Sequence, residues 1–306
     1  ARIRHIQDLI IDNAVFDDLL SYLYYPSPYC FDVIPLKSIS DIYDLFLGYH
    51  LEYDDSGILE NVLKSEFRKS NGAVTTPEHI VHNTIDSTVP SEYLQSLTNQ
   101  QILDLKFLDP ACGSGVFLVS IYDHLATQIE SNIEERKDVL PHRYLYEKDG
   151  KKYLNLEGRK LIVNQCLHGV DINQECVEVA KLSLSLKIID GFEPIDFNNA
   201  GLYGSQILHG VGVNIKCGNS LVEPDILERF SCISENLEEL AATNVFDYKT
   251  AFCDIFSRGG FDYVIGNPPY VEVKNYNVAL PCMSAYIKQR YGSSRNGENR
   301  PCYSVY

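Results

Sequence analysis

The sequence predicts an α/β fold with a parallel sheet, preceded by a layer of helices. Three observations support this prediction. Strand-like and helix-like segments alternate from about residue 61 onward, apolar residues recur at helical spacing before that point, and polar motifs follow the predicted strands. Alternating strands and helices form βαβ units, in which ligands bind at the carboxyl ends of the strands.

Residues 1–60 are expected to form the helical layer. Apolar side chains lie at helical spacing in two stripes, of which the first contains Ile6, Leu9, Ile10, Phe16, Leu19, Leu20 and Leu23 and the second Ile39, Ile42, Tyr43, Phe46 and Leu47. Such stripes are typical of helices that pack against a core. We therefore interpret this region as a packing layer.

The predicted sheet has four strands, over residues 105–109, 167–172, 213–218 and 261–266. Long helices are expected over 116–137 and 174–189, between the strands. Two stretches interrupt the alternation: residues 138–160 are expected to form a polar hairpin, and residues 221–260 contain an acidic helical segment.

Composition limits the possible functions. The 306 residues are 45% hydrophobic and contain no apolar run long enough to span a membrane. The net charge of −16 argues against a protein that simply coats nucleic acid, since phosphate binding requires a basic surface. Nine cysteines without a Cys-x-x-Cys pair suggest free thiols in a reducing cytoplasm. The chain opens with Ala1 rather than Met, as an excised piece would.

The stretch "FLDPACGSG" (107–115) predicts a strand end, a glycine-rich turn and a helix start. Glycines allow close backbone approach to a ligand, and a helix N-terminus offers free N–H groups. The spacing matches neither the dinucleotide nor the P-loop fingerprint. Asp109 would repel a pyrophosphate and would suit the ammonium group of an amino acid. An ordinary βα turn is the alternative.

Two further strand ends carry polar residues. Asp171 follows the second strand, where an acidic side chain commonly binds ribose hydroxyls, although it is equally a turn or cap residue. Asn219 and Ser220, in "CGNSL" after the third strand, offer hydrogen bonds to a heterocycle edge, and here a plain turn is the favoured interpretation.

Upstream, "NGAVTTPEHIVHNTI" (71–85) predicts a helix with Thr76 as N-cap and Pro77 at the first helical position. His79 and His82 lie one turn apart in it, but no third ligand is evident, so we expect no metal site.

The fourth strand ends in Asn267-Pro268-Pro269-Tyr270. The Asn267 side-chain oxygen and the Pro268 carbonyl are acceptors that can take two hydrogen bonds from one planar NH₂ group, and Tyr270 can stack on the ring that bears it. Prolines hold such acceptors rigidly, which is preorganisation. A rigid loop without a function is the alternative.

Together these motifs resemble those of the gamma-class N6-adenine DNA methyltransferases, in the arrangement of type IIG and type I restriction–modification enzymes. "DPACGSG" is similar to their cofactor loop, "NPPY" to their catalytic motif and "GAVTTP" to their methionine-binding motif. The resemblance implies a Rossmann-like S-adenosylmethionine-dependent fold. "NPPY" alone is shared with methylases of glutamine and RNA, so another planar amine or amide, or a non-catalytic cofactor-binding fragment, remains an alternative.

The resemblance also implies roles for individual residues. Cofactor-binding residues would be Thr76, Asp109, Ala111 and Gly113 around the methionine part, Asp171 on the ribose, and Ile172 and Asn219 at the adenine. Catalytic residues would be Asn267, Pro268 and Tyr270, acting on an adenine flipped out of double-stranded DNA.

The expected organisation is a helical region over 1–60 and a methyltransferase core over 61–306. The family's remaining sheet strands and target-recognition domain would lie beyond Tyr306, so the sheet is expected to be incomplete at its C-terminus. A nuclease would precede Ala1, in the same polypeptide or complex. A basic DNA-binding surface in those parts would reconcile DNA binding with the charge of −16.

Overall fold

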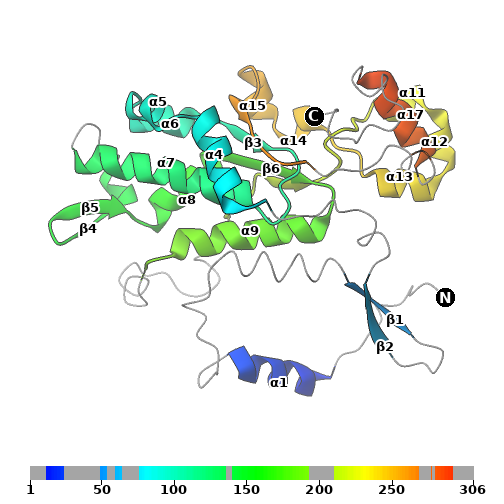
Figure 1. Cartoon of the computed structure of the whole chain (residues 1–306), viewed down its shortest axis with the longest axis horizontal. Helices are drawn as coiled ribbons and strands as arrows, with labels where there is room; N and C mark the ends of the chain where they lie inside the picture. Colours follow the sequence, from blue (N-terminus) through cyan, green and yellow to red (C-terminus); the bar gives the residue numbers. More distant parts are fainter. Residues whose placement is uncertain are drawn as a thin grey trace.

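The computed structural model describes residues 12–23, 49–53, 59–63, 76–135, 140–192, 210–268, 277 and 280–291. A parallel four-stranded sheet lies at the centre of the main body (Figure 1). Its strands are β3 (Phe107–Asp109), β6 (Leu167–Asp171), β7 (Ile215–Cys217) and β8 (Tyr263–Val264), in the order β7-β6-β3-β8. The predicted α/β class is therefore confirmed, with shorter strands than expected.

The strand residues alternate between two apolar layers, because successive side chains point to opposite faces of a sheet. Phe107 and Leu167 belong to the larger core. Leu108 and Val170 belong to a smaller cluster that includes Phe252. Both faces of the sheet are thus covered, as is usual for a parallel sheet.

The larger core is formed with α7 (Val116–Glu134), α8 (Leu156–Cys166) and α9 (Gln174–Ile189). The bounds of α9 are those that the sequence predicts. Helix α8 was not predicted, because Gly158, Arg159 and Lys160 obscure its apolar stripe. Its start is nevertheless well defined, since the Asn155 side chain accepts the N–H of Gly158.

Three helices precede the sheet and pack against α7 or α8: α4 (Glu78–Thr88), α5 (Ser91–Gln95) and α6 (Asn99–Asp104). The predicted polar hairpin is also present, as the antiparallel strands β4 (Leu145–Lys148) and β5 (Lys151–Leu154), after the short 3₁₀ helix η3 (His142–Tyr144).

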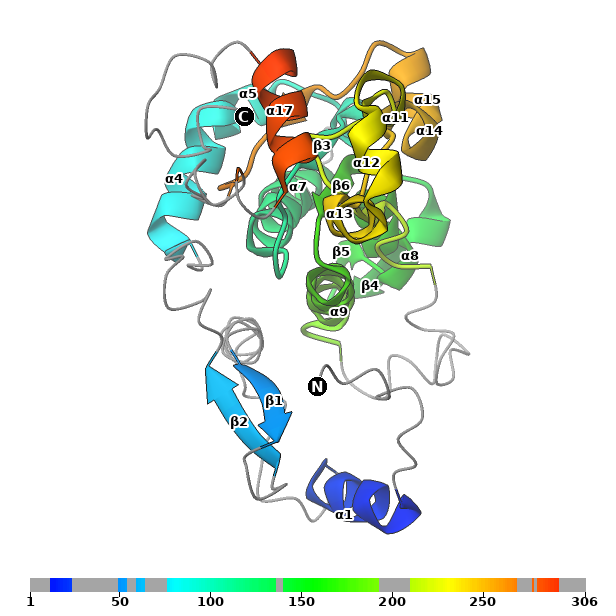
Figure 2. The same ribbon diagram turned by 90° about the vertical axis from the view of Figure 1, so that its right-hand side faces the viewer.

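A small helical bundle lies at one end of the main body, where Figures 1 and 2 both show its four helices together. It contains α11 (Ile226–Arg229), α12 (Ser231–Glu235), α13 (Leu237–Thr243) and α17 (Pro281–Arg290), which share their own apolar cluster. Two short helices, α14 (Tyr248–Ala251) and α15 (Cys253–Ser257), connect the bundle to β8 and help to form the smaller cluster.

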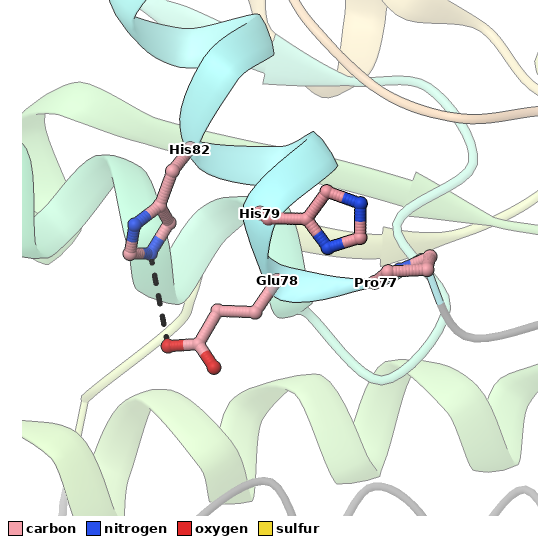
Figure 3. Close-up of a pocket in the computed structure, with 4 residues that line it drawn as sticks. All are labelled: Pro77, Glu78, His79 and His82. Carbon is pink, nitrogen blue, oxygen red and sulfur yellow. Dashed lines mark ion pairs between the residues drawn. The ribbon is translucent and has the colours of Figure 1, made fainter.

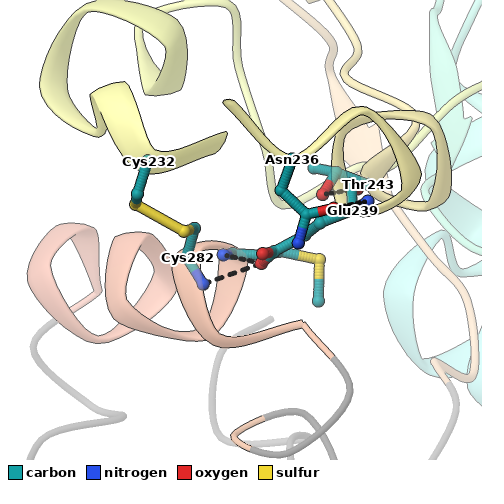
Figure 4. Close-up of a disulfide and its surroundings, with 6 residues drawn as sticks. Cys232, Asn236, Glu239, Thr243 and Cys282 are labelled. Atoms are coloured by element: carbon teal, nitrogen blue, oxygen red, sulfur yellow. Dashed lines mark hydrogen bonds between the residues drawn. A yellow bond between two sulfur atoms is a disulfide. The ribbon is translucent and has the colours of Figure 1, made fainter. Parts of the chain in front are cut away.

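A disulfide joins α12 to α17 within the bundle, between Cys232 and Cys282 (Figure 4). Their Cα atoms are 6.6 Å apart, within the usual range for this bond. The expectation of free thiols is therefore wrong for this pair, because residues 50 positions apart meet only in the folded bundle. Cys112, Cys166, Cys176, Cys217 and Cys253 are free, as expected.

Glu239 reinforces the same junction. One carboxylate oxygen accepts the N–H groups of Cys282 and Met283, at 2.7 and 3.0 Å, and so caps the N-terminus of α17 (Figure 4). The side chain is 3% exposed. A carboxylate at this helix end also complements the helix dipole.

The N-terminal part contains α1 (Asn13–Leu23) and a hairpin of β1 (Tyr49–Tyr53) and β2 (Leu59–Leu63), which lie apart from the main body in both views (Figures 1 and 2). Helix α1 includes part of the first predicted stripe, and the stripe over 39–47 lies outside the described residues. The hairpin differs from the expected helical layer, since β1 and the first two residues of β2 lie within residues 1–60. Strand β2 also runs across the predicted boundary at residue 60.

Among the described helices, none has the length and apolar character needed to cross a bilayer.

Candidate functional site

The order of the strands creates a switch point between β3 and β8. The chain runs from β3 to the neighbouring β6 and then to β7, and returns to the other side of β3 to form β8. Ligands of open α/β sheets bind where the strand order reverses, outside the carboxyl ends of the strands. Asp109 is the last residue of β3 and Asn267 follows β8, the two strands that flank this point. The arrangement is Rossmann-like in this respect.

The glycine-rich loop after β3 is held against β6. The Cys112 N–H donates to the Val170 carbonyl at 3.0 Å, and the Gly115 N–H closes a turn onto the Cys112 carbonyl at 2.8 Å. Gly113 has a φ of 53°, a conformation that favours glycine, and the space where its side chain would stand is open. The loop therefore presents bare backbone at the strand ends.

Asp171 connects the tip of β6 to this loop. One carboxylate oxygen accepts the Gly113 N–H at 2.9 Å, and the other accepts the Asn173 N–H at the start of α9, also at 2.9 Å. The Cys176 side chain is a third hydrogen-bond partner, and the two oxygens together have about four acceptor sites, so the carboxylate retains capacity for a further donor. Ile172, the next residue, is 50% exposed. An acidic group thus lies beside an exposed apolar side chain, as the sequence predicts for a nucleoside site.

Asp109 is almost completely buried, with 1% of its surface exposed. The pKa of its carboxyl group is raised to about 7, chiefly by burial; the N–H bond from Ala111 lowers the pKa, and the negative charge of Asp171 raises it. Burial also raises the pKa of Asp171, although N–H bonds from Asn173 and Gly113 oppose that shift. Perturbed carboxyl groups at the ends of sheet strands are typical of functional sites.

The Asn219 side chain is buried and contacts other residues of the protein. It is 8% exposed, its side-chain oxygen accepts the Leu221 N–H at 3.0 Å, and its amide nitrogen contacts the Met283 sulfur at 3.5 Å. Ser220, its neighbour, donates its hydroxyl to the Pro110 carbonyl and so fastens the glycine-rich loop. The predicted contact of Asn219 with a cofactor adenine stays a prediction.

Asn244 is a residue that the sequence analysis missed. Its side-chain nitrogen donates to the Ile172 carbonyl at 3.0 Å, and its own carbonyl accepts the Asn219 N–H at 2.6 Å. It therefore ties the ends of β6 and β7 together. Asn244 has a φ of 47°, a left-handed conformation that Asn tolerates. A single Asn after a helical stretch does not reveal this role in the sequence.

Thr76 and Asn267 meet across the site. The Asn267 side-chain nitrogen donates to Thr76 Oγ1 at 3.0 Å, over a sequence separation of 191 residues. The predicted role of Thr76 as N-cap is wrong: α4 begins at Glu78, and its N-cap is Pro77, without a side-chain cap bond. The Thr76 hydroxyl accepts the bond from Asn267 instead. This bond orients the Asn267 amide so that its nitrogen faces Thr76 and its oxygen faces away from Thr76.

The remaining predicted catalytic residues are only partly described. Pro268 is half-buried after Asn267, while Tyr270 lies outside the described residues. Ala111 donates its N–H to the Asp109 carboxylate at 3.1 Å and so forms part of the loop.

A surface hollow of about 480 Å³ lies at the start of α4, next to Thr76 in the sequence (Figure 3). It is lined by Pro77, Glu78, His79 and His82 at the start of α4, and Glu78 and His82 form an ion pair with an N–O distance of 3.9 Å. No cluster of three His, Cys, Asp or Glu side chains suited to a metal ion occurs in the described part of the chain.

Comparison with protein families finds two matches, which overlap over residues 165–200. Residues 56–200 match the family described as N-6 DNA Methylase. Residues 165–306 match the family described as Eco57I restriction-modification methylase. The first match contains Asp109 and Asp171, and the second contains Asp171 and Asn267.

The curated relatives are much longer than this chain. The type II restriction enzyme and methyltransferase RM.Eco57I of Escherichia coli is 26% identical over 299 residues, which cover 95% of this chain and 27% of that protein. A putative type II restriction enzyme and methyltransferase of Methanocaldococcus jannaschii is 29% identical over 283 residues, which cover 80% of this chain and 21% of that protein. The chain thus spans about a quarter of their length.

Among solved structures, the type IIL restriction-modification enzyme MmeI in complex with DNA is similar, with a TM-score of 0.42 and 16% identity over 77% of this chain and 28% of that one. The DrdV–DNA complex has a TM-score of 0.41 and 18% identity, over 88% of this chain and 21% of that one.

Proposed function

We propose that the protein containing this chain transfers a methyl group from S-adenosylmethionine to adenine N6 in DNA. The chain belongs to the N6-adenine DNA methyltransferases of restriction–modification systems. The observation that supports this most directly is the bond between Thr76 and Asn267. It holds Thr76 beside Asn267, next to the switch point where the glycine-rich loop begins.

The described residues fit S-adenosylmethionine. Asp109 offers a carboxyl group for the ammonium of the methionine part, and the open space at Gly113 leaves room for a ligand against the backbone. Asp171 retains acceptor capacity for ribose hydroxyls, and the exposed side of Ile172 offers an apolar surface for adenine. When bound, the cofactor supplies a methyl group on a sulfonium sulfur, an activated donor.

The chain's own contribution to the reaction is the orientation of the target amine. Asn267 Oδ1 and the Pro268 carbonyl would each accept one hydrogen bond from the N6 amino group. Two acceptors on one NH₂ group favour a pyramidal nitrogen, whose lone pair then points away from the ring. The proton is lost after the attack, so a strong base is not required. Because Thr76 fixes the Asn267 amide, little reorganisation is needed.

The target base has to leave the duplex to reach these acceptors, and Tyr270 would stack on it and offset part of the unstacking cost. With a net charge of −16, the chain has little basic surface for DNA. We therefore propose that other parts of the longer cytoplasmic protein, including a target-recognition domain and a nuclease, supply most of the DNA contacts.

Product analysis tests the proposal. The complete protein is incubated with S-adenosylmethionine labelled in the methyl group and with DNA, RNA or protein as acceptor, and the DNA is digested to nucleosides. We expect the label in N6-methyladenine from double-stranded DNA. Label in cytosine, in RNA or in protein glutamine, or no transfer at all, would contradict it.

A further inference from the structure

The Asp109 carboxyl group occupies the space in which a side chain at residue 266 would begin. A Cβ placed on Gly266 would lie 2.3 Å from Asp109 Oδ1, 3.0 Å from its Cγ and 3.4 Å from Pro110 Cδ. The first of these distances is far inside van der Waals contact, so any side chain would force one partner to move. Gly266 does not have a positive φ. A glycine is therefore required here for space and not for backbone conformation.

Asp109 has little freedom to move away. Its side chain is 1% exposed, and Oδ1, the atom nearest to Gly266, accepts the Ala111 N–H at 3.1 Å. The next residue, Pro110, is held through its carbonyl by the Ser220 hydroxyl. Asp109 is also the last residue of β3, which is paired on both sides, with β6 and β8. The carboxyl group is thus held by one hydrogen bond, and the backbone that carries it is held by the Pro110 contact and by the pairing of β3.

Residue 266 has a weaker hold on the sheet. Pairing between β3 and β8 ends at Leu108 and Val264, and the last bond runs from the Ile265 N–H to the Leu108 carbonyl at 2.9 Å. Gly266 is the first residue beyond that bond, and Asn267 follows it directly. A displacement at residue 266 is therefore transmitted to Asn267, because consecutive Cα atoms have a fixed separation.

We propose that Gly266 is a positioning residue that sets the separation between the glycine-rich loop and Asn267, through direct contact with the Asp109 carboxyl group. The inference rests on the proposed function, in which the loop holds the methyl donor and Asn267 holds the acceptor amine. Because the Asp109 carboxyl group packs directly against the backbone of Gly266, the distance between the glycine-rich loop and Asn267 cannot change without moving one of them. A shift of about 1 Å in such a geometry lowers reaction rates by roughly 100-fold.

The test is Gly266→Ala in the complete protein, with Gly158→Ala as the matched control. A Cβ at Gly158 would lie 2.5 Å from the Tyr144 carbonyl oxygen and 3.0 Å from Leu154 Cδ2, a comparable clash remote from the site. Because the β8 side yields more easily than Asp109, we expect Gly266→Ala to lower the single-turnover methyl-transfer rate at saturating substrates by roughly 100-fold. Its dissociation constant for S-adenosylmethionine should change by less than about tenfold. Gly158→Ala should lose stability without this loss of rate.

A double-mutant cycle identifies the contact partner. Asp109→Ala removes both side-chain atoms that lie nearest to residue 266, Oδ1 and Cγ. In that background, Gly266→Ala should change the transfer rate by less than about threefold, since the clash is gone. The same comparison serves if Gly266→Ala alone proves too unstable to assay.

The outcomes separate the two proposals. If the wild-type protein is active, two results would overturn this inference alone. One is a transfer rate of Gly266→Ala equal to that of Gly158→Ala. The other is an equal loss of rate from Gly266→Ala in the wild-type and Asp109→Ala backgrounds. A wild-type protein that transfers no methyl group to adenine would overturn the proposed function and this inference with it.

Discussion

Asp171 Oδ2 accepts the backbone N–H of Gly113 at 2.9 Å, and this bond joins the tip of β6 to the glycine-rich loop after β3. A single carboxylate thus shapes the loop, and in the proposed function its remaining acceptor capacity serves a ribose hydroxyl. The same group holds the start of α9 through the Asn173 N–H. Loss of this side chain should disturb binding of the cofactor more than any other single change at the strand ends.

Asp171→Ala is expected to weaken binding of S-adenosylmethionine by about 100-fold, since charge-assisted hydrogen bonds contribute roughly 1.5–3 kcal/mol each. Isothermal titration calorimetry measures this. Glu147→Ala, which removes an exposed carboxylate in the β4–β5 hairpin, is the control and should bind normally. Equal affinities of the two variants would contradict the assignment of Asp171 to the cofactor.

Asn267→Ala is expected to abolish methyl transfer while S-adenosylmethionine still binds within about threefold of the wild-type affinity, because the variant removes an acceptor for the target amine and not a cofactor contact. The transfer rate is measured with labelled cofactor and the affinity by calorimetry. Asn83→Ala, at an exposed position of α4, controls for the loss of an amide. If the complete protein with Asn267→Ala still methylated adenine, the catalytic assignment would be wrong.

Thr76→Val keeps the shape of the side chain and removes the oxygen that accepts the Asn267 amide. One hydrogen bond contributes about 1 kcal/mol, so the transfer rate should fall by roughly 5- to 10-fold. Thr76→Ser retains the hydroxyl and should restore most of the rate. A defect of equal size in both variants would show that the hydroxyl does not orient Asn267.

The raised pKa of Asp109, about 7 in the fold against 3.8 for an unperturbed group, predicts a pH dependence of stability. Between these values the native state binds a proton that the unfolded state has lost, so the free energy of unfolding falls as pH rises from about 4 to 7. The slope from this group is at most about 1.4 kcal/mol per pH unit. Above pH 7 its contribution no longer changes.

Urea unfolding at several pH values measures this dependence. Asp109→Asn carries no titrating group and should be less sensitive to pH over the same range. A second consequence concerns the ligand: the ammonium of S-adenosylmethionine should lower the pKa of Asp109, and binding near pH 7 should release a proton. Calorimetry in buffers of different ionisation enthalpy detects that release, and its absence would argue against contact between the two groups.

The Cys232–Cys282 disulfide closes a loop of 50 residues, which includes Asn267 and Pro268. Cross-linking a loop of this length reduces the entropy of the unfolded chain by an amount equivalent to about 4 kcal/mol at most. Cys232→Ser should therefore lower the free energy of unfolding of the bundle by about 2–4 kcal/mol. Cys253→Ser changes an exposed free thiol and serves as control. Reduction of the wild-type protein should reproduce the effect of Cys232→Ser, and a wild-type stability that does not respond to reduction would contradict it.

The sequence was informative where local pattern and fold agree. The helix over 174–189 has a continuous apolar pattern and an Asn cap, and its predicted bounds match those of α9. The strand before Asp171 is a buried apolar run, and it was placed to within one residue. The strand predicted over 261–266 is longer than the two-residue β8, because the apolar pattern continues beyond the paired residues, where only single backbone bonds such as that from the Ile265 N–H to the Leu108 carbonyl remain.

The rest depends on contacts between distant segments. Nothing near Thr76 reveals that its hydroxyl is used by Asn267, and the Thr-Pro pattern suggested a helix cap instead. Likewise, Gly266 reads as an ordinary strand-end glycine until Asp109 is placed against it. Cys232 and Cys282 have no motif spacing, so only the packing of α12 on α17 brings them together.

The bond between Thr76 and Asn267 also has a consequence for biosynthesis. The ribosome produces Thr76 191 residues before its partner. The glycine-rich loop and Asp171 are both complete well before Asn267 emerges, so a nascent chain can assemble the donor half of the site first. Strand β8, which brings in Asn267, pairs with β3 only near the end of this segment's synthesis. Asn267 is therefore the last of these described site residues to be synthesised.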